Sequence, residues 1–145
     1  MGQRIYLASS WRNARQPEVL AALRNAGHEV YDFRSPSSHF RWDAIDADWE
    51  SWTTEQYLEG LQDPKADFGF GQDFAAMQWA DVGVLLLPCG RSAHLEAGYF
   101  VGAGKRLVIA LEGNEEPELM YKMADTICRV GDVVDAVAAL DLAEV

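Results

Sequence analysis

The chain has 145 residues, of which 49% are hydrophobic and 24% charged, and its formal net charge is −11. This length supports one domain with a full hydrophobic core. No apolar run is long enough to cross a bilayer, and the first ten residues lack the features of a signal peptide, so we expect a cytoplasmic protein with no membrane partner. The acidic total argues against a nucleic-acid polymer as a partner, because like charges repel.

The charges are unevenly distributed along the chain. Residues 1–42 carry six arginines, whereas residues 43–73 carry nine acidic residues and a single lysine. A basic patch beside a small-molecule pocket is therefore compatible with the acidic total. A phosphate group on a small ligand needs only one or two arginines.

The cysteines and histidines are few and scattered. Two cysteines, Cys89 and Cys128, fit a reducing compartment, and the second has the setting of a buried strand residue. Neither cysteine has a second cysteine or a histidine at the spacing of metal ligands. We predict no metal ion and no cofactor.

The first third of the chain has the pattern of a strand, a helix and a second strand. Residues 3–8 predict the first strand, a polar loop follows, and a helix starts near Pro17 and ends at Gly27. Residues 28–33 predict the second strand. Such a unit closes as a right-handed crossover between parallel strands.

Residues 34–71 interrupt this alternation with a tryptophan-rich, acidic insertion. A short helix is predicted at 54–61, capped by Thr53 or Thr54 and ended by the Asp63–Pro64 pair. Long insertions in compact α/β domains are functional or disordered, and three tryptophans argue against disorder. The insertion is either a lid over a pocket or a docking surface for a second subunit.

The second half of the chain continues the alternation of helices and strands. We expect a single domain over residues 1–145, with a doubly wound five-stranded parallel sheet in the flavodoxin-like order 2-1-3-4-5. The expected elements are a helix at 71–80, a strand at 82–87, a helix at 93–103, a strand at 107–111, a helix at 117–124, a strand at 126–130 and a helix at 133–140 capped by Asp132.

Glu96 is the one charge that departs from the pattern of the central helix. The prediction places it in the first turn, where the helix dipole favours an ionised carboxylate. It could be an ordinary surface glutamate matched to the dipole. Two features favour a functional role. The Gly90–Ser92 loop lies just before Glu96, at the carboxyl edge where open parallel sheets bind their ligands, and Gly98 and Gly102 would allow close helix packing.

Three features of the sequence, taken in order, resemble the nucleoside 2-deoxyribosyltransferase superfamily, which includes deoxynucleoside 5′-monophosphate N-glycosidases. They are the strand Ile5–Ala8, Asp73 ahead of the third strand, and the motif Leu95–Tyr99 followed by Gly104–Lys105. The resemblance in element order covers nearly the whole chain. It implies a flavodoxin-like fold, a nucleoside or nucleotide as the small-molecule partner, and a homo-oligomer, a dimer or larger, with the aromatic residues of 42–52 as the expected contact.

The resemblance also implies roles for three residues. Glu96 would be the nucleophile, Tyr6 would position it, and Asp73 would handle the base. An ionised carboxylate would then attack the anomeric carbon, and water or a second base would resolve the glycosyl ester with net retention. Because a base leaves readily only when its ring nitrogen gains a proton, a second carboxyl group is needed, and Asp73 is the candidate.

The sequence departs from the transferases of this superfamily in one loop. Those enzymes carry an aspartate shortly before the nucleophile, whereas the loop 88–92 has no acidic residue here. In the nucleotide hydrolases the same loop grips the 5′-phosphate. An arginine and a serine at a helix N-terminus make an anion site. This feature favours hydrolysis of a nucleoside monophosphate over base exchange between free nucleosides. The expected substrate-binding residues are Ser9, Ser10, Arg12, Gly90, Arg91 and Ser92, with Trp42 and Trp49 of the insertion stacking on the base.

Two other functions remain open at this stage. One is an NAD-cleaving hydrolase of the Toll/interleukin-receptor type, which also carries a helix-borne glutamate beside a flavodoxin-like sheet. The other is a nucleotide-sensing module that binds its ligand without turnover, using the loop around Arg91 as an anion nest. Binding and catalysis need nearly the same residues, so the sequence does not separate them.

Overall fold

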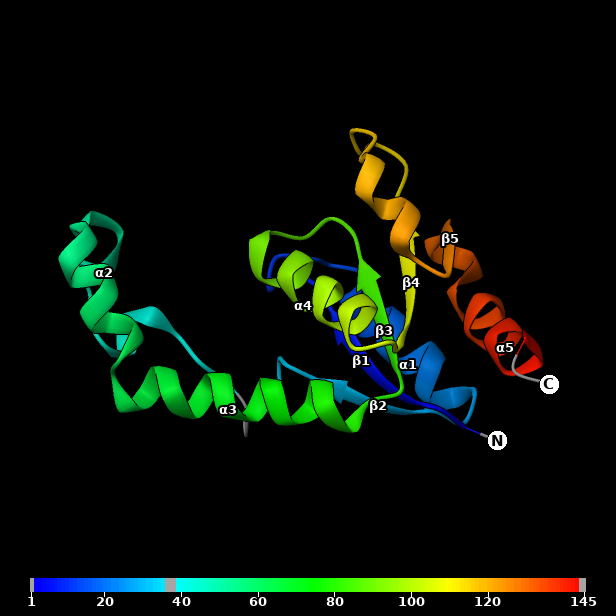
Figure 1. Ribbon diagram of the computed structural model, residues 1–145, viewed down its shortest axis with the longest axis horizontal. Coiled ribbons are helices and arrows are strands. Elements are labelled where there is room, and N and C mark those ends of the chain that lie inside the picture. Colours follow the sequence, from blue (N-terminus) through cyan, green and yellow to red (C-terminus); the bar gives the residue numbers. More distant parts are fainter. Residues whose placement is uncertain (1, 36–38, 144–145) are drawn as a thin grey trace. The chain divides into compact units, whose positions relative to one another are not determined.

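A parallel sheet forms the centre of the computed structural model, which describes residues 2–35 and 39–143, with side chains up to residue 140. The sheet has five strands in the order β2-β1-β3-β4-β5 (Figure 1), so the predicted fold class and strand order are confirmed. The strands are β1 (Arg4–Ala8), β2 (Glu29–Asp32), β3 (Val82–Leu86), β4 (Arg106–Leu111) and β5 (Thr126–Arg129).

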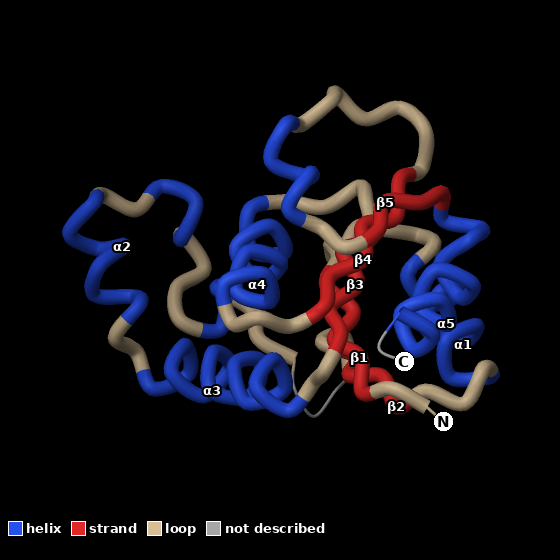
Figure 2. The backbone as a smooth tube through the Cα atoms, turned by 45° about the vertical axis from the view of Figure 1, so that its right-hand side comes forward, coloured by secondary structure: helices blue, strands red, loops and turns tan. Residues whose placement is uncertain are grey.

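Helices cover both faces of this sheet. Figure 2 shows α1 (Gln16–Asn25) and α5 (Val133–Ala143) on one face and α4 (Arg91–Gly102) on the other. The remaining helical segments are α2 (Thr54–Leu61), α3 (Pro64–Trp79) and the short 3₁₀ segments η1 (Trp42–Ala44), η2 (Trp49–Ser51), η3 (Leu119–Met123) and η4 (Val130–Asp132). Because both faces are covered, all five residues of β3 are buried, as its continuous apolar run predicts.

Two glycines end helices as predicted. Gly27 after α1 has φ of 97° and Gly104 after α4 has φ of 75°. A residue with a Cβ atom is strained in this left-handed region, so glycine is the ordinary residue there. Cys128 lies on β5 as expected, but it is half-buried rather than fully buried.

The chain divides into two compact units, residues 1–32 with 77–145, and residues 33–76. The sheet and the helices α1, α4 and α5 belong to the first unit. The second unit holds η1, η2, α2 and most of α3. A single domain over the whole chain stays a prediction.

An aromatic cluster of three half-buried rings, those of Phe40, Trp42 and Trp52, packs together within the second unit. The ring of Trp42 meets Phe40 edge-on at 4.8 Å between centroids, and it meets Trp52 edge-on at 5.9 Å. Two glycines make room for these rings. A Cβ atom on Gly60 would lie 2.4 Å from the Trp52 indole, and one on Gly69 would lie 2.9 Å from Phe40. Trp42 therefore contributes to the packing of its own unit.

The start of α2 is capped as the sequence predicts, and Thr53 is the capping residue. Its hydroxyl accepts the N–H of Gln56 at 3.2 Å, and the Gln56 side chain accepts the N–H of Thr53 at 2.8 Å. This reciprocal pair satisfies two N–H groups that a helix start leaves open.

The predicted start of α3 is wrong, because the helix begins at Pro64 and not at Gly71. Proline suits the first turn, and Asp63 accepts the N–H of Lys65 at 2.8 Å. These start signals outweigh the low helix propensity of Gly69 and Gly71, which lie inside the helix. Asp73 consequently lies in the middle of the helix and does not cap it. The predicted helix at 117–124 is also too long, since only the 3₁₀ segment η3 forms there.

Lys105 joins the end of α3 to the start of β4. Its ammonium group donates to the carbonyls of Met77 at 2.9 Å, Gln78 at 2.6 Å and Ala80 at 2.5 Å. A helix end leaves its last carbonyls without helical partners, and a cation there also complements the helix dipole.

We expect Lys105→Met to lower the free energy of unfolding by about 1–3 kcal/mol, because it removes charged hydrogen bonds to three carbonyls. Urea unfolding followed by circular dichroism measures this loss. Lys122→Met, which changes an exposed lysine, is the matched control. Equal stability of the two variants would contradict the capping role.

Candidate active site

The candidate site is centred on a hydrogen bond between Tyr6 and Glu96. The Tyr6 hydroxyl donates to the Glu96 Oε2 atom at 2.6 Å, and the two residues are 90 positions apart in the chain. Tyr6 lies on β1 with no exposed surface, and Glu96 projects from α4 in a half-buried position. The structure therefore brings together two of the three residues predicted to act in catalysis.

Two predictions about the setting of Glu96 are wrong. The helix begins at Arg91, so Glu96 is its sixth residue and lies beyond the first turn, where the dipole effect has declined. Gly98 and Gly102 do not mediate close packing, because a Cβ atom on either would meet no described atom within 4 Å. The close approach occurs instead at Gly83 on β3, where a Cβ atom would lie 2.8 Å from the Phe100 ring.

The N-terminus of α4 has the features of an anion site. Gly90 is the N-cap residue, and no side chain among the described residues caps the helix there. Its first-turn N–H groups therefore lack the usual side-chain acceptor. Arg91 and Ser92 are exposed in this first turn. This arrangement suits a phosphate or carboxylate group.

Buried polar contacts connect the β1–α1 loop to the loop after β3. The Ser9 hydroxyl donates to the carbonyl of Leu86 at 2.9 Å, and the Asn13 amide donates to the carbonyl of Pro88 at 3.2 Å. Asn13 is 2% exposed. Sequence analysis missed it, although an asparagine in a loop between a strand and a helix is a usual source of such contacts.

Within the β1–α1 loop, Ser10 and Arg12 interact locally. The Ser10 hydroxyl accepts the backbone N–H of Arg12 at 3.1 Å, and the Arg12 residue is exposed. The two loops thus lie at the same edge of the sheet, beyond the carboxyl ends of β1 and β3. Ser9 is one of the predicted substrate-binding residues, but its hydroxyl proton is already donated to the carbonyl of Leu86.

Three predicted site residues belong to the second unit. Asp73 is half-buried on α3, Trp42 lies in the aromatic cluster, and Trp49 is 40% exposed on η2. Their contacts with a substrate stay predictions.

Cys89 lies close to the Glu96 carboxylate. Burial, as the larger cause, and the negative charge of Glu96 together raise the pKa of the Cys89 thiol to about 12. The thiol is therefore neutral at physiological pH and is no nucleophile there. Its Sγ atom also lies 3.8 Å from Nδ1 of His94.

His94 connects α4 to the segment between β4 and β5. Its Nδ1 atom lies 2.8 Å from the carbonyl oxygen of Gly90, which can only accept, so Nδ1 carries the proton. In the neutral ring, Nε2 then accepts the hydroxyl of Tyr121 at 2.8 Å. Sequence analysis did not single out either residue, because they lie 27 positions apart.

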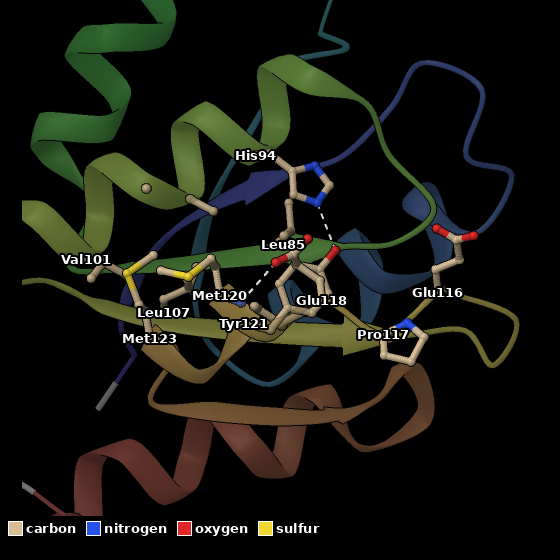
Figure 3. Close-up of a pocket in the computed structure, with 13 residues that line it drawn as sticks. Leu85, His94, Val101, Leu107, Glu116, Pro117, Glu118, Met120, Tyr121 and Met123 are labelled. Carbon is tan, nitrogen blue, oxygen red and sulfur yellow. Dashed lines mark hydrogen bonds between the residues drawn. The ribbon is translucent and has the colours of Figure 1, made fainter.

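A cavity of about 460 Å³ lies between α4 and η3, over β3 and β4 (Figure 3). Hydrophobic side chains such as Val101, Met120 and Met123 line it. Its polar lining comes from His94, Tyr121 and the acidic residues Glu116 and Glu118. Glu96 is not among its lining residues. On a helix, residues 94, 98 and 101 share one side, and residue 96 faces away from them.

Among residues 2–35 and 39–143, no three His, Cys, Asp or Glu side chains gather so that they could hold a metal ion. None of the described helices is both long and apolar enough to pass through a membrane.

Solved structures resemble this chain, although no family model and no curated protein matches its sequence. A 2-deoxyribosyltransferase from Bacillus psychrosaccharolyticus superposes with a TM-score of 0.61 and 23% identity, over 90% of this chain and 89% of the other. The chain has the 2-deoxyribosyltransferase fold. The same fold is found in the CMP N-glycosidase of Clostridium botulinum, at a TM-score of 0.51 and 12% identity, over 95% of this chain and 99% of that one.

We expect Cys89 to react slowly with iodoacetamide at pH 8, because its pKa near 12 leaves little thiolate. In Glu96→Gln the charge is lost, so the pKa should fall and alkylation should accelerate. Peptide mass spectrometry separates Cys89 from Cys128, and Cys89→Ser confirms the assignment. An unchanged rate in Glu96→Gln would show that the carboxylate does not act on this thiol.

Proposed function

We propose that this protein cleaves or transfers the N-glycosidic bond of a nucleoside, deoxynucleoside or nucleoside 5′-monophosphate. The observation that supports it most is the 2.6 Å hydrogen bond from buried Tyr6 to Glu96, in a chain with the 2-deoxyribosyltransferase fold. A carboxylate held at the ligand-binding edge of such a sheet is suited to attack on a sugar. The structural relatives act on a deoxyribosyl group and on CMP, respectively.

In the proposed reaction, the Glu96 carboxylate attacks the anomeric carbon of the sugar. The bond between this carbon and the base nitrogen breaks, its electron pair leaves with the base, and a glycosyl ester of Glu96 forms. A carboxylic acid protonates the departing base, and Asp73 is the proposed donor. Water or a second base then displaces Glu96 from the anomeric carbon, so that two inversions give net retention.

The proposed phosphate site is the N-terminus of α4. Gly90 supplies the cap position without a competing side chain, and Arg91 and Ser92 add a guanidinium group and a hydroxyl group in the same turn. Ser10 and Arg12 of the neighbouring loop are proposed to complete this site. Ser9 is proposed to contribute indirectly, because its hydrogen bond to the carbonyl of Leu86 holds the β1–α1 loop beside this site.

The proposed base site is formed by the insertion. Trp49 has exposed ring surface that can stack on a base, whereas Trp42 is occupied in part by Phe40 and Trp52. A homo-oligomer that uses residues 42–52 stays a prediction, as does a cytoplasmic location.

We expect Glu96→Gln to abolish base release while the protein keeps its fold. Glutamine is nearly isosteric and still accepts the Tyr6 hydroxyl, but it is a very poor nucleophile, so the rate should fall by at least about 10³-fold. Chromatography of a nucleoside and nucleotide panel, with NAD included, measures the liberated bases. Turnover near the wild-type rate in the variant would remove Glu96 as nucleophile, and nicotinamide release alone would favour an NAD-cleaving hydrolase.

We expect Arg91→Ala to weaken turnover of nucleoside monophosphates far more than that of nucleosides. The loss of a charge-assisted contact to phosphate should lower kcat/KM for monophosphates by about tenfold to a hundredfold. Arg129→Ala, an exposed arginine on β5, serves as the control. Equal losses on both substrate types would refute the phosphate role of Arg91.

A further inference from the structure

The Tyr6 ring is held between two other aromatic rings. Tyr31 stacks on it with the centroids 5.4 Å apart and an interplanar angle of 17°. Phe100 contacts it at 5.9 Å with a tilt of 42°. Tyr6 has no exposed surface and Phe100 is 1% exposed, so neither ring has room to turn away. The direction of the Tyr6 hydroxyl is therefore set by packing.

The sheet register explains why Tyr31 stacks on Tyr6. The two residues are direct partners in the parallel pairing of β1 with β2. Partners in register project to the same face of a sheet, so their rings lie side by side. Tyr31 comes near the end of β2, at the carboxyl edge of the sheet where the candidate site lies.

Gly83 fixes the third ring of this group. A Cβ atom at this position of β3 would lie 2.8 Å from the Phe100 ring, which shows that the ring rests directly on the strand. The ammonium group of Lys105 lies 5.9 Å from the centre of the same ring. Phe100 is therefore a rigid support on one side of Tyr6, and Tyr31 is the support on the other.

We propose that Tyr31 is a positioning residue for Glu96. Its ring fixes the Tyr6 phenol, and the phenol hydroxyl fixes the carboxylate at 2.6 Å. The inference rests on the proposed function, because it assigns Tyr31 to the orientation of the proposed nucleophile. A nucleophile reacts fast only when its oxygen is held in line with the carbon that it attacks. Loss of the Tyr31 ring should loosen this alignment without removing any group that contacts the sugar.

The test compares Tyr31→Leu with Tyr31→Phe in the base-release assay. Tyr31→Leu should lower kcat by about tenfold to a hundredfold and leave KM nearly unchanged, because orientation affects the reacting state more than binding. Tyr31→Phe keeps the ring and should retain most of the activity. An equal loss in both variants would overturn the proposal, as would a rise in KM with unchanged kcat, which indicates contact with substrate.

A double-mutant cycle shows whether Tyr31 acts through Tyr6. In a Tyr6→Phe background the hydroxyl that holds Glu96 is gone, so Tyr31→Leu should cause little further loss. Independent, multiplicative losses would overturn the proposal. The melting temperature of each variant is measured alongside, and Tyr31→Met replaces Tyr31→Leu if the leucine variant does not fold.

A second measurement does not depend on turnover. Glutamate labelled with ¹³C at the side-chain carboxyl gives one NMR signal for Glu96, identified by its absence in Glu96→Gln. A donated hydrogen bond favours the ionised form of a carboxylate. Tyr31→Leu should therefore move the titration of this signal to higher pH, towards that of Tyr6→Phe, and an unmoved titration would overturn the proposal. If wild-type protein releases no base but this shift occurs, the proposed function fails and the positioning role stands.

Discussion

The burial of the Tyr6 phenol is the constraint on which the candidate site depends. A hydroxyl group without exposed surface must find a partner inside the protein, since an unpaired one costs about 1–3 kcal/mol. The Tyr6 hydroxyl donates to the Glu96 carboxylate, which lies on α4 and is 90 positions away in the chain. This hydrogen bond thus joins β1 to α4 and keeps the Glu96 side chain half-buried. An ordinary surface glutamate would instead extend into solvent.

Side chains that donate to backbone carbonyls hold the loops at the carboxyl edge of the sheet in place. Ser9 and Asn13 both donate to carbonyls of the segment that follows β3. On the far side of α4, His94 donates to the carbonyl of Gly90, and Tyr121 donates to His94. These contacts use carbonyl groups and no first-turn N–H group of α4, so the loop can be held in place and still present N–H donors to an anion.

The fold could be predicted from local patterns, because β3, β4 and the helix-ending glycines each carry a short-range signal. The start of α3 could not, since the sequence assigned residues up to 71 to the insertion, whereas proline and the Asp63 contact start the helix at residue 64. Glu96 was identifiable as a charge out of pattern. Asn13 and His94 were not, because their partners are distant carbonyl and hydroxyl groups that no sequence spacing reveals.

Trp52 of the insertion has a structural role that the composition alone does not reveal. It lies against Gly60 and donates its N–H to the Asp46 carboxylate at 2.8 Å. This hydrogen bond is also the main reason that the pKa of the Asp46 carboxyl lies below its usual range. The backbone N–H of Asp48 adds a smaller effect in the same direction. The second unit is small, so large rings such as these contribute to its own packing. Trp49, with 40% of its surface exposed, is the tryptophan of residues 42–52 with the most surface left for a ligand.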